Sequence, residues 1–313
     1  DAGGRYNGMN SIFQPSIQID VSEDTPYRFC EYTGLNKLYN EEEEELSLAL
    51  LYRNKKVYGT GHGTSVYWDI DRNGLGYIIN DFFPQIEVPQ MDFGIADSNV
   101  NSGCLSMKFL SDLDSTPISD KISAMKTLVD SYSSWIDDLQ MMSEDKSRVA
   151  IQFQPKAKEH IANCKEACER MNTGLSLLGE NPIITQAFLM ANRAMFMQRI
   201  HLKLQETDKY PGDLELQERI KTLDYYKDDD NYSWRPFQLA FLLMSIQSIV
   251  NPDCNERDIV DLIWFPTGGG KTEAYLGLTA FTIFFRRLSF PDNAGGTTVI
   301  MRYTLRLLAA QQF

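Results

Sequence analysis

The sequence predicts an α/β protein in three parts: a β-rich N-terminal domain over residues 1–118, a helical accessory domain over residues 119–230, and the beginning of a parallel-sheet α/β domain over residues 231–313. Three features lead to this interpretation. Apolar and polar residues alternate in parts of the first region, and apolar residues recur at helical spacing in the second. In the third, a glycine-rich loop lies between a strand pattern and a helix pattern.

Strand and turn patterns dominate the first region. Residues 16–21 alternate between apolar and polar side chains, as does part of residues 48–58, and both stretches are expected to form strands. The glycine-rich stretch Gly59–Gly63 is expected to be a hairpin turn. The proline-bounded stretch Phe83–Pro89 is typical of an edge segment, because proline cannot donate to a strand ladder.

Long helices are predicted in the second region. Their apolar stripes, several of them rich in methionine, are typical of helices that pack into a core. The periodicity places these helices near residues 119–144, 156–178, 183–208 and 214–226.

The chain has five cysteines, an odd number without the spacing of a disulfide framework. This usage indicates free thiols in a reducing compartment, so we expect a cytoplasmic protein. His160, Cys164 and Cys168 fall on one face of the second predicted helix. They could form a soft-metal site, or the cysteines could be small buried residues of a core stripe.

No stretch approaches the roughly 18 consecutive apolar residues that a membrane span needs, and the N-terminus carries no secretory signal. The chain starts at Asp1 without a methionine, so we expect it to be a portion of a longer protein.

The third region contains a phosphate-binding loop. Residues 259–265 form a short apolar strand pattern, and residues 273–288 show helical spacing without proline. Glycines allow consecutive backbone N–H groups to turn toward a polyphosphate. The candidate nucleotide-binding residues between the two patterns are Thr267, Gly268, Gly269, Gly270, Lys271 and Thr272.

Each polar residue of the loop has an expected role. Lys271 should reach the β- and γ-phosphates of ATP, and Thr272 should hold Mg²⁺. The N-terminus of the following helix should add its positive dipole end. Phe265 departs from the strict pattern, which has a small residue there, and a glycine turn with a chance Lys-Thr pair is the alternative.

Gln238 is a candidate adenine-binding residue. It lies 33 residues before Lys271, on a helix that is predicted to begin at Pro236 and to end near Val250. A glutamine amide can donate to and accept from one purine edge at the same time.

Three segments together resemble the superfamily-2 helicases. Arg235–Gln238 resembles their Q-motif region, and Pro266–Thr272 resembles their motif I. After a second apolar strand pattern, Thr304–Gln311 resembles motif Ia, in which Arg306 and Gln311 match the family and Thr304 and Leu305 do not. The resemblance implies a RecA-like lobe with a parallel sheet that binds ATP and Mg²⁺. It also implies that Arg306 and Gln311 contact DNA.

A closer resemblance, to the helicases of bacterial DISARM anti-phage systems, extends over most of the chain. Gly61–Gly63, residues 191–195, residues 264–278 and residues 301–312 carry it. It implies a DNA-binding ATPase that works with a partner subunit, DrmB.

The charge distribution is compatible with a DNA-binding function. The net charge is −13, but residues 231–313 contain seven basic and six acidic residues, so the acidity lies in residues 1–230. Acidic runs such as Glu41–Glu45 and Asp228–Asp230 are typical of solvated faces, although they could also keep DNA away until a partner displaces them.

A helicase also needs an Asp-Glu pair on a later strand, which completes the Mg²⁺ site and orients the attacking water, and an arginine finger from a second lobe. Neither feature is found in the sequence up to Phe313. We therefore expect that this segment alone does not hydrolyse ATP. Two alternatives remain open: a P-loop ATPase that acts on protein or in signalling, and a partner-binding platform with a vestigial loop.

Overall fold

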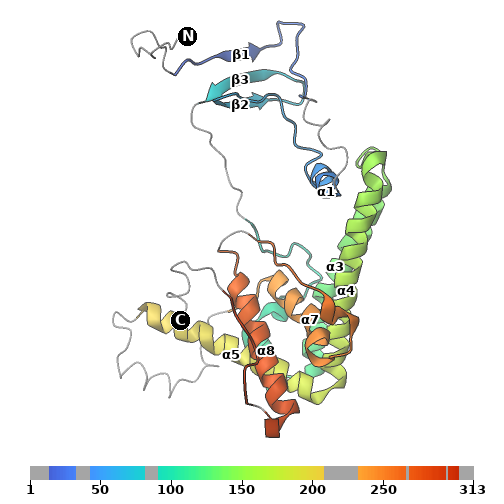
Figure 1. The fold of residues 1–313 in the computed structure, drawn as a ribbon, viewed down its shortest axis with the longest axis vertical. Coiled ribbons are helices and arrows are strands. Elements are labelled where there is room, and N and C mark those ends of the chain that lie inside the picture. Colours follow the sequence, from blue (N-terminus) through green and yellow to red (C-terminus); the bar gives the residue numbers. More distant parts are fainter. Residues whose placement is uncertain are drawn as a thin grey trace, which may run out of the picture. The chain divides into compact units, whose positions relative to one another are not determined.

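The computed structural model describes residues 14–32, 43–81, 91–207, 232–265, 268–293 and 295–302. The chain divides into two compact units, and each is described by itself. The first contains residues 1–91 and 145–157, and the second contains residues 92–144 and 158–313. The described part has mostly helix and one small antiparallel sheet (Figure 1).

The first unit contains a three-stranded antiparallel sheet in the order β1-β3-β2. Its strands are β1 (Gln18–Val21), β2 (Ser65–Ile70) and β3 (Gly76–Asp81). β1 confirms the strand that alternation predicts around residues 16–21. In the register, Ile78 of β3 lies opposite Ile19 of β1 on one side and Trp68 of β2 on the other.

A tight hairpin joins β2 to β3. The Asp71 Oδ1 atom accepts hydrogen bonds from the backbone N–H groups of Asn73 and Leu75, at 2.8 and 2.9 Å. Gly74 has a φ of +79°, which glycine adopts without the strain that a Cβ would bring. The hairpin of this unit is therefore at residues 71–75.

Two predictions for this unit are wrong. Residues 48–51 belong to helix α1 (Glu43–Leu51) and form no strand. Acidic residues favour the first turn of a helix, and the leucines and alanine that follow are strong helix formers. Gly59–Gly63 is a loop leading into β2 and not a hairpin turn, because residues 52–58, just before it, form no strand. The predicted edge segment Phe83–Pro89 lies outside the described residues.

Helix α1 is held within the first unit. Its Leu50 is buried in a small cluster with Val149 and Ala157. Arg53, just after the helix, donates to the backbone oxygens of Leu50 and Arg148.

The second unit is helical, and its long helices confirm the periodicity of the sequence. They are α3 (Ile118–Glu144), α4 (Gln154–Glu180), which enters this unit from Lys158, α5 (Pro182–Thr207), α7 (Pro236–Val250) and α8 (Lys271–Ser289). The short helix α2 (Met107–Ser111) precedes them. Single 3₁₀ turns across the chain are η3 (Ser102–Leu105), η4 (Ile151–Phe153), η6 (Asn255–Asp258) and η7 (Pro291–Asn293). The helix predicted near residues 214–226 lies outside the described residues.

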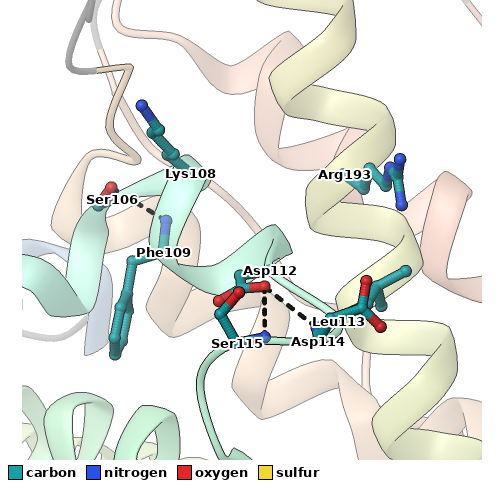
Figure 2. A pocket seen from close by; sticks show the side chains of 8 residues that line it. All are labelled: Ser106, Lys108, Phe109, Asp112, Leu113, Asp114, Ser115 and Arg193. Carbon is teal, nitrogen blue, oxygen red and sulfur yellow. Dashed lines mark hydrogen bonds between the residues drawn. The ribbon is translucent and has the colours of Figure 1, made fainter. Parts of the chain in front are cut away.

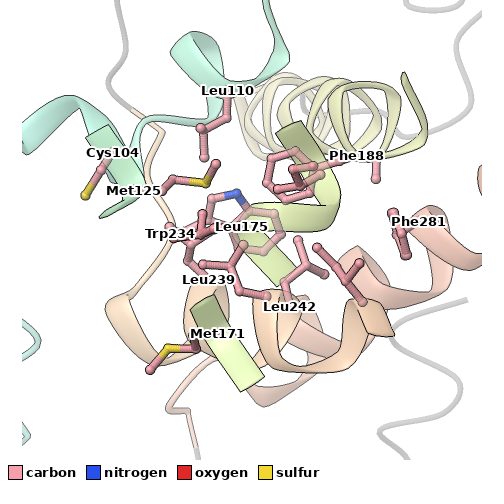
Figure 3. Close-up of a cluster of buried hydrophobic side chains, with 14 of the residues drawn as sticks. Cys104, Leu110, Met125, Met171, Leu175, Phe188, Trp234, Leu239, Leu242 and Phe281 are labelled. Atoms are coloured by element: carbon pink, nitrogen blue, oxygen red, sulfur yellow. The ribbon is translucent and has the colours of Figure 1, made fainter. Parts of the chain in front are cut away.

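The core of the second unit surrounds Trp234, the residue that comes two positions before α7 (Figure 3). Only 2% of this tryptophan is exposed, and its Nε1–H donates to the Oδ1 atom of the fully buried Asn192 on α5, at 2.7 Å. The Asn192 amide donates in turn to the Phe188 backbone oxygen. Burial of an indole is favourable when its N–H has a partner, so this bond lets Trp234 occupy the centre of the core.

Helices α4 and α7 approach each other closely at a glycine. A Cβ at Gly174 would lie 2.2 Å from the Leu243 backbone oxygen, so only glycine fits there. This contact sets the distance between α7 and α4.

The cysteines on α4 belong to the core. Cys168 is buried and its Sγ lies against the Val129 backbone oxygen of α3, while Cys164 lines the same cluster. Burial raises the pKa of the Cys168 thiol. Among the described residues, no group of three His, Cys, Asp or Glu side chains could hold a metal ion.

The parallel sheet expected over residues 231–313 is not seen. In the described part of residues 232–302, residues 259–265 and 297–301 form no strand ladder. A strand needs a hydrogen-bonding neighbour, and these two segments do not pair with each other.

Among the described helices, none has both the length and the apolar character that a membrane span requires.

Two glycines of α4 provide a matched test of this packing. We expect Gly174→Ala to lower the free energy of unfolding by about 2 kcal/mol, because the new methyl group would force α7 away from α4. Gly179→Ala is the control, since a Cβ there makes only a 3.4 Å contact with Ile122. It should change the free energy of unfolding by less than about 1 kcal/mol, toward higher stability. Denaturant unfolding measures both, and equal losses would contradict the close approach.

Candidate nucleotide site

The glycine-rich loop leads directly into the N-terminus of α8. Gly268 and Gly270 have φ values of +79° and +82°, which side-chain-bearing residues rarely adopt. Gly270 is the N-cap residue of α8, so the unpaired N–H groups of the first helical turn begin at this loop. A Cβ at Gly268 would find no atom within 4 Å, so open space lies beside the loop.

Gln238 joins the start of α7 to the glycine loop. Its Oε1 atom accepts from the Arg235 backbone N–H, and its Nε2 atom donates to the Gly270 backbone oxygen, both at 2.7 Å. Only 4% of Gln238 is exposed. The predicted adenine-binding residue is therefore next to the loop, and both ends of its amide bind the protein.

Arg235 is a second contact between α7 and the loop. Its Nη1 atom donates to the Gly268 backbone oxygen at 3.2 Å. Its guanidinium lies over the Phe93 ring, with 4.1 Å between Cζ and the ring centroid.

An aromatic cluster lies beneath this arginine. The rings of Phe237 and Phe265 are stacked with their centroids 4.0 Å apart, and Phe93 contacts both rings at about 6 Å. Phe265 is the large residue that departs from the strict loop pattern, and its stacking on Phe237 accounts for its size. Sequence reasoning missed Phe93, because no local pattern connects it with a loop so far along the chain.

Lys271 is the first residue of α8, and its side chain turns back over the loop. Its Nζ atom donates to the Phe265 backbone oxygen. Thr272 follows on the same turn and is half-buried. Glu273 lies 3.9 Å from Arg199 of α5. The structure thus brings together Gln238, Lys271, Thr272 and the glycines.

For three of the predicted site residues, the structure describes no position. Thr267, Arg306 and Gln311 lie outside the described residues. Their roles stay predictions.

The segment before the loop is extended and has two different sides. Val260, Leu262 and Trp264 are 93%, 79% and 86% exposed, whereas the residues between them are at least half-buried. This alternation is that of an extended strand in which both sides carry apolar residues.

An ion pair binds the inner side of that segment to α4. Two Arg170 nitrogens each contact one Asp261 oxygen at 2.7 Å, and the Arg170 side chain is only 7% exposed. These hydrogen bonds raise the pKa of the Arg170 guanidinium, so it stays charged.

Helix α8 is held against α5 and α7, and the loop depends on this packing (Figure 1). Its buried side consists of Ala274, Gly277 and Phe281. A Cβ at Gly277 would lie 2.7 Å from the Trp234 ring, so α8 can approach the indole only because a glycine is there.

A separate hollow of about 550 Å³ lies between α2 and α5 (Figure 2). The Asp112 carboxylate on its wall accepts hydrogen bonds from the backbone of Asp114 and Ser115. The fully buried Lys121 supports the same turn by donating to the backbone oxygens of Asp112 and Thr116. None of the predicted site residues lines this hollow.

The glycine loop has the chemistry of an anion site. Backbone N–H groups at a helix N-terminus, a lysine and open space together suit a polyphosphate. The donor set is therefore compatible with the predicted nucleotide, and Thr272 follows Lys271 in the first turn of α8.

No protein-family model matches the chain. The chain is similar to the DISARM protein DrmA of Bacillus paralicheniformis (strain ATCC 9945a / NCIMB 11709 / CD-2), with 33% identity over 318 aligned residues. The alignment covers 98% of this chain and 26% of the relative, so the chain spans about a quarter of the relative's length. The chain therefore matches a segment of a DrmA-like protein.

Proposed function

We propose that this chain carries the first nucleotide-binding motifs of an ATP-dependent DNA helicase or translocase that acts in bacterial anti-phage defence. The observation that carries the proposal is the glycine loop at the N-terminus of α8, with Gln238 and Lys271 in contact with it. The similarity to a DISARM protein supports the defence role.

ATP binding would use groups that now contact the loop itself. Lys271 would exchange the Phe265 backbone oxygen for the β- and γ-phosphates, because a phosphate is a stronger partner for an ammonium than a neutral carbonyl. Gln238 would exchange one of its two protein partners for the adenine edge. Thr272 would hold Mg²⁺, which supplies positive charge to the phosphates when it is bound.

The exposed apolar side chains before the loop support a RecA-like lobe. A parallel strand in such a sheet is covered on both faces and carries apolar residues on both. Residues 259–265 have this composition, with Val260, Leu262 and Trp264 exposed on one side. We propose that this segment is the first strand of the parallel sheet and residues 297–301 the second.

The DNA contact is assigned to Arg306 and Gln311 of the motif Ia resemblance. A strand-to-helix corner offers N–H groups and a cation to a phosphate without reading the base sequence. We also propose that the protein works with a partner subunit resembling DrmB and that it is located in the cytoplasm.

The lysine provides the first test. In the full-length protein, Lys271→Ala should lower DNA-stimulated ATP hydrolysis by at least about a hundredfold, because the developing phosphate charge loses its main cation. The midpoint of thermal unfolding should stay close to that of the wild type. Lys126→Ala is the control, since Lys126 is exposed and its side-chain partners are Asp130 on α3 and Asn172 on α4, neither of which belongs to the glycine loop.

The outcomes separate the competing functions. Full ATPase activity of Lys271→Ala would refute the assignment of the loop. Wild-type ATPase that does not respond to DNA would instead indicate an ATPase that acts on protein. The absence of saturable ATP binding would indicate a vestigial loop on a partner-binding platform.

A second test concerns base recognition by Gln238. We expect Gln238→Ala to weaken ATP binding about tenfold more than GTP binding, because the amide is assigned to the adenine edge. Ser248→Ala on the same helix is the control, since its hydroxyl donates only to the Ser245 backbone oxygen. Equal weakening of both nucleotides, measured by titration, would show that Gln238 only supports the loop.

A further inference from the structure

The Arg170–Asp261 ion pair joins the helical accessory region to the segment that leads into the glycine loop. Both contacts are 2.7 Å long and involve two different nitrogens and two different oxygens. Such a two-point contact fixes the direction of the carboxylate as well as its position. Asp261 lies four residues before Phe265 in the same extended segment, and this segment leads into the loop.

Few other contacts define the position of this segment. It has no strand ladder within the described part of residues 232–302, and the side chains on its outer side are exposed. Its inner side is held at Asp261 by Arg170 and at Phe265 by the stacked ring of Phe237. The two anchors are therefore Asp261, near the middle of residues 259–265, and Phe265, at the end next to the loop.

The surroundings of Arg170 favour a guanidinium over other cations. Its Nε atom is buried without a hydrogen-bond partner among the described residues, and so is the Glu256 Oε2 atom. The charge of Glu256 also attracts Arg170. Arg170 thus lies in the field of three carboxylates, those of Asp261, Glu256 and Glu166, while its planar fork binds the first of them.

We propose that Arg170 is a positioning residue for phosphate binding: by fixing Asp261, it holds the start of the glycine loop where the N-terminus of α8 and Lys271 can bind the same polyphosphate. The inference rests on the proposed nucleotide-binding function. It assigns to α4, a helix outside the three helicase-like motifs, an indirect influence on nucleotide affinity that acts through Asp261.

Fold stability alone is a weaker explanation for this pair. A largely buried ion pair such as this one, with the Arg170 side chain 7% and the Asp261 side chain 24% exposed, often stabilises a fold no better than well-packed apolar residues, because the charges lose their hydration. What apolar residues cannot provide is the directional two-point contact. The directional two-point contact therefore explains why an arginine and an aspartate are paired here and not two apolar residues.

The test measures nucleotide and tripolyphosphate affinity in the full-length protein, well below the midpoint of unfolding. Asp261→Asn should weaken the binding of both ligands by about tenfold or more and to the same extent, because a misplaced loop affects phosphates and not the base. Arg170→Lys should weaken both ligands as well, because it keeps the charge and loses the fork. Asp258→Asn, an exposed carboxylate of the preceding turn, should leave both affinities unchanged.

A double variant separates positioning from stability. Arg170→Met combined with Asp261→Leu should recover the unfolding midpoint, since apolar packing replaces the buried charges. Its affinity for ATP and tripolyphosphate should nevertheless stay as low as that of Asp261→Asn. If the affinity recovers together with the stability, the pair is only structural and the inference is wrong.

The remaining outcomes are also decisive. If the wild type binds neither ATP nor tripolyphosphate, the proposed function fails and this inference fails with it. If the wild type binds ATP and Asp261→Asn binds it equally well, only the inference is overturned. If Asp261→Asn does not fold, the double variant and Arg170→Lys give the same comparison.

Discussion

The hydrogen bond between the Trp234 indole and Asn192 is the interaction on which the geometry of the candidate site depends. It places the tryptophan ring at the centre of the core, against Gly277 of α8 and directly before the first residues of α7. The next residue, Arg235, and the nearby Gln238 then contact the glycine loop. Packing that is far from any ligand thus determines where the loop and the N-terminus of α8 lie relative to α7.

Local patterns in the sequence predicted the local structure well. Long segments with a 3.6-residue period form helices at almost the predicted positions, because their apolar stripes determine both the helix and its buried face. The strand expected within residues 48–58 was wrong, since Leu48–Leu51 continue a helix from Glu43 and residues 52–58 form no strand. The hairpin lies at Asn73 and Gly74, an Asn-Gly pair that favours such turns and that sequence reasoning could have used.

Contacts between distant segments could not be predicted in the same way. Nothing near Phe93 indicates that it lies under Arg235, and nothing near Arg170 indicates a pairing with Asp261. Parallel strands depend on partners elsewhere in the chain, so an apolar run alone cannot establish a ladder. Gln238 lies beside the loop, and its role in binding adenine stays a prediction. The structure adds that its amide binds the Arg235 and Gly270 backbones, so adenine recognition has to compete with these two bonds.

The central claim is that the glycine loop binds the phosphates of ATP. A crystal or cryo-EM structure of the full-length protein with Mg²⁺ and a non-hydrolysable ATP analogue tests it most directly. We predict phosphate density beside Gly268–Gly270, with the Lys271 Nζ atom moved from the Phe265 backbone oxygen to a phosphate oxygen. A nucleotide bound elsewhere, with Lys271 still on the Phe265 backbone oxygen at saturating concentration, would contradict the account.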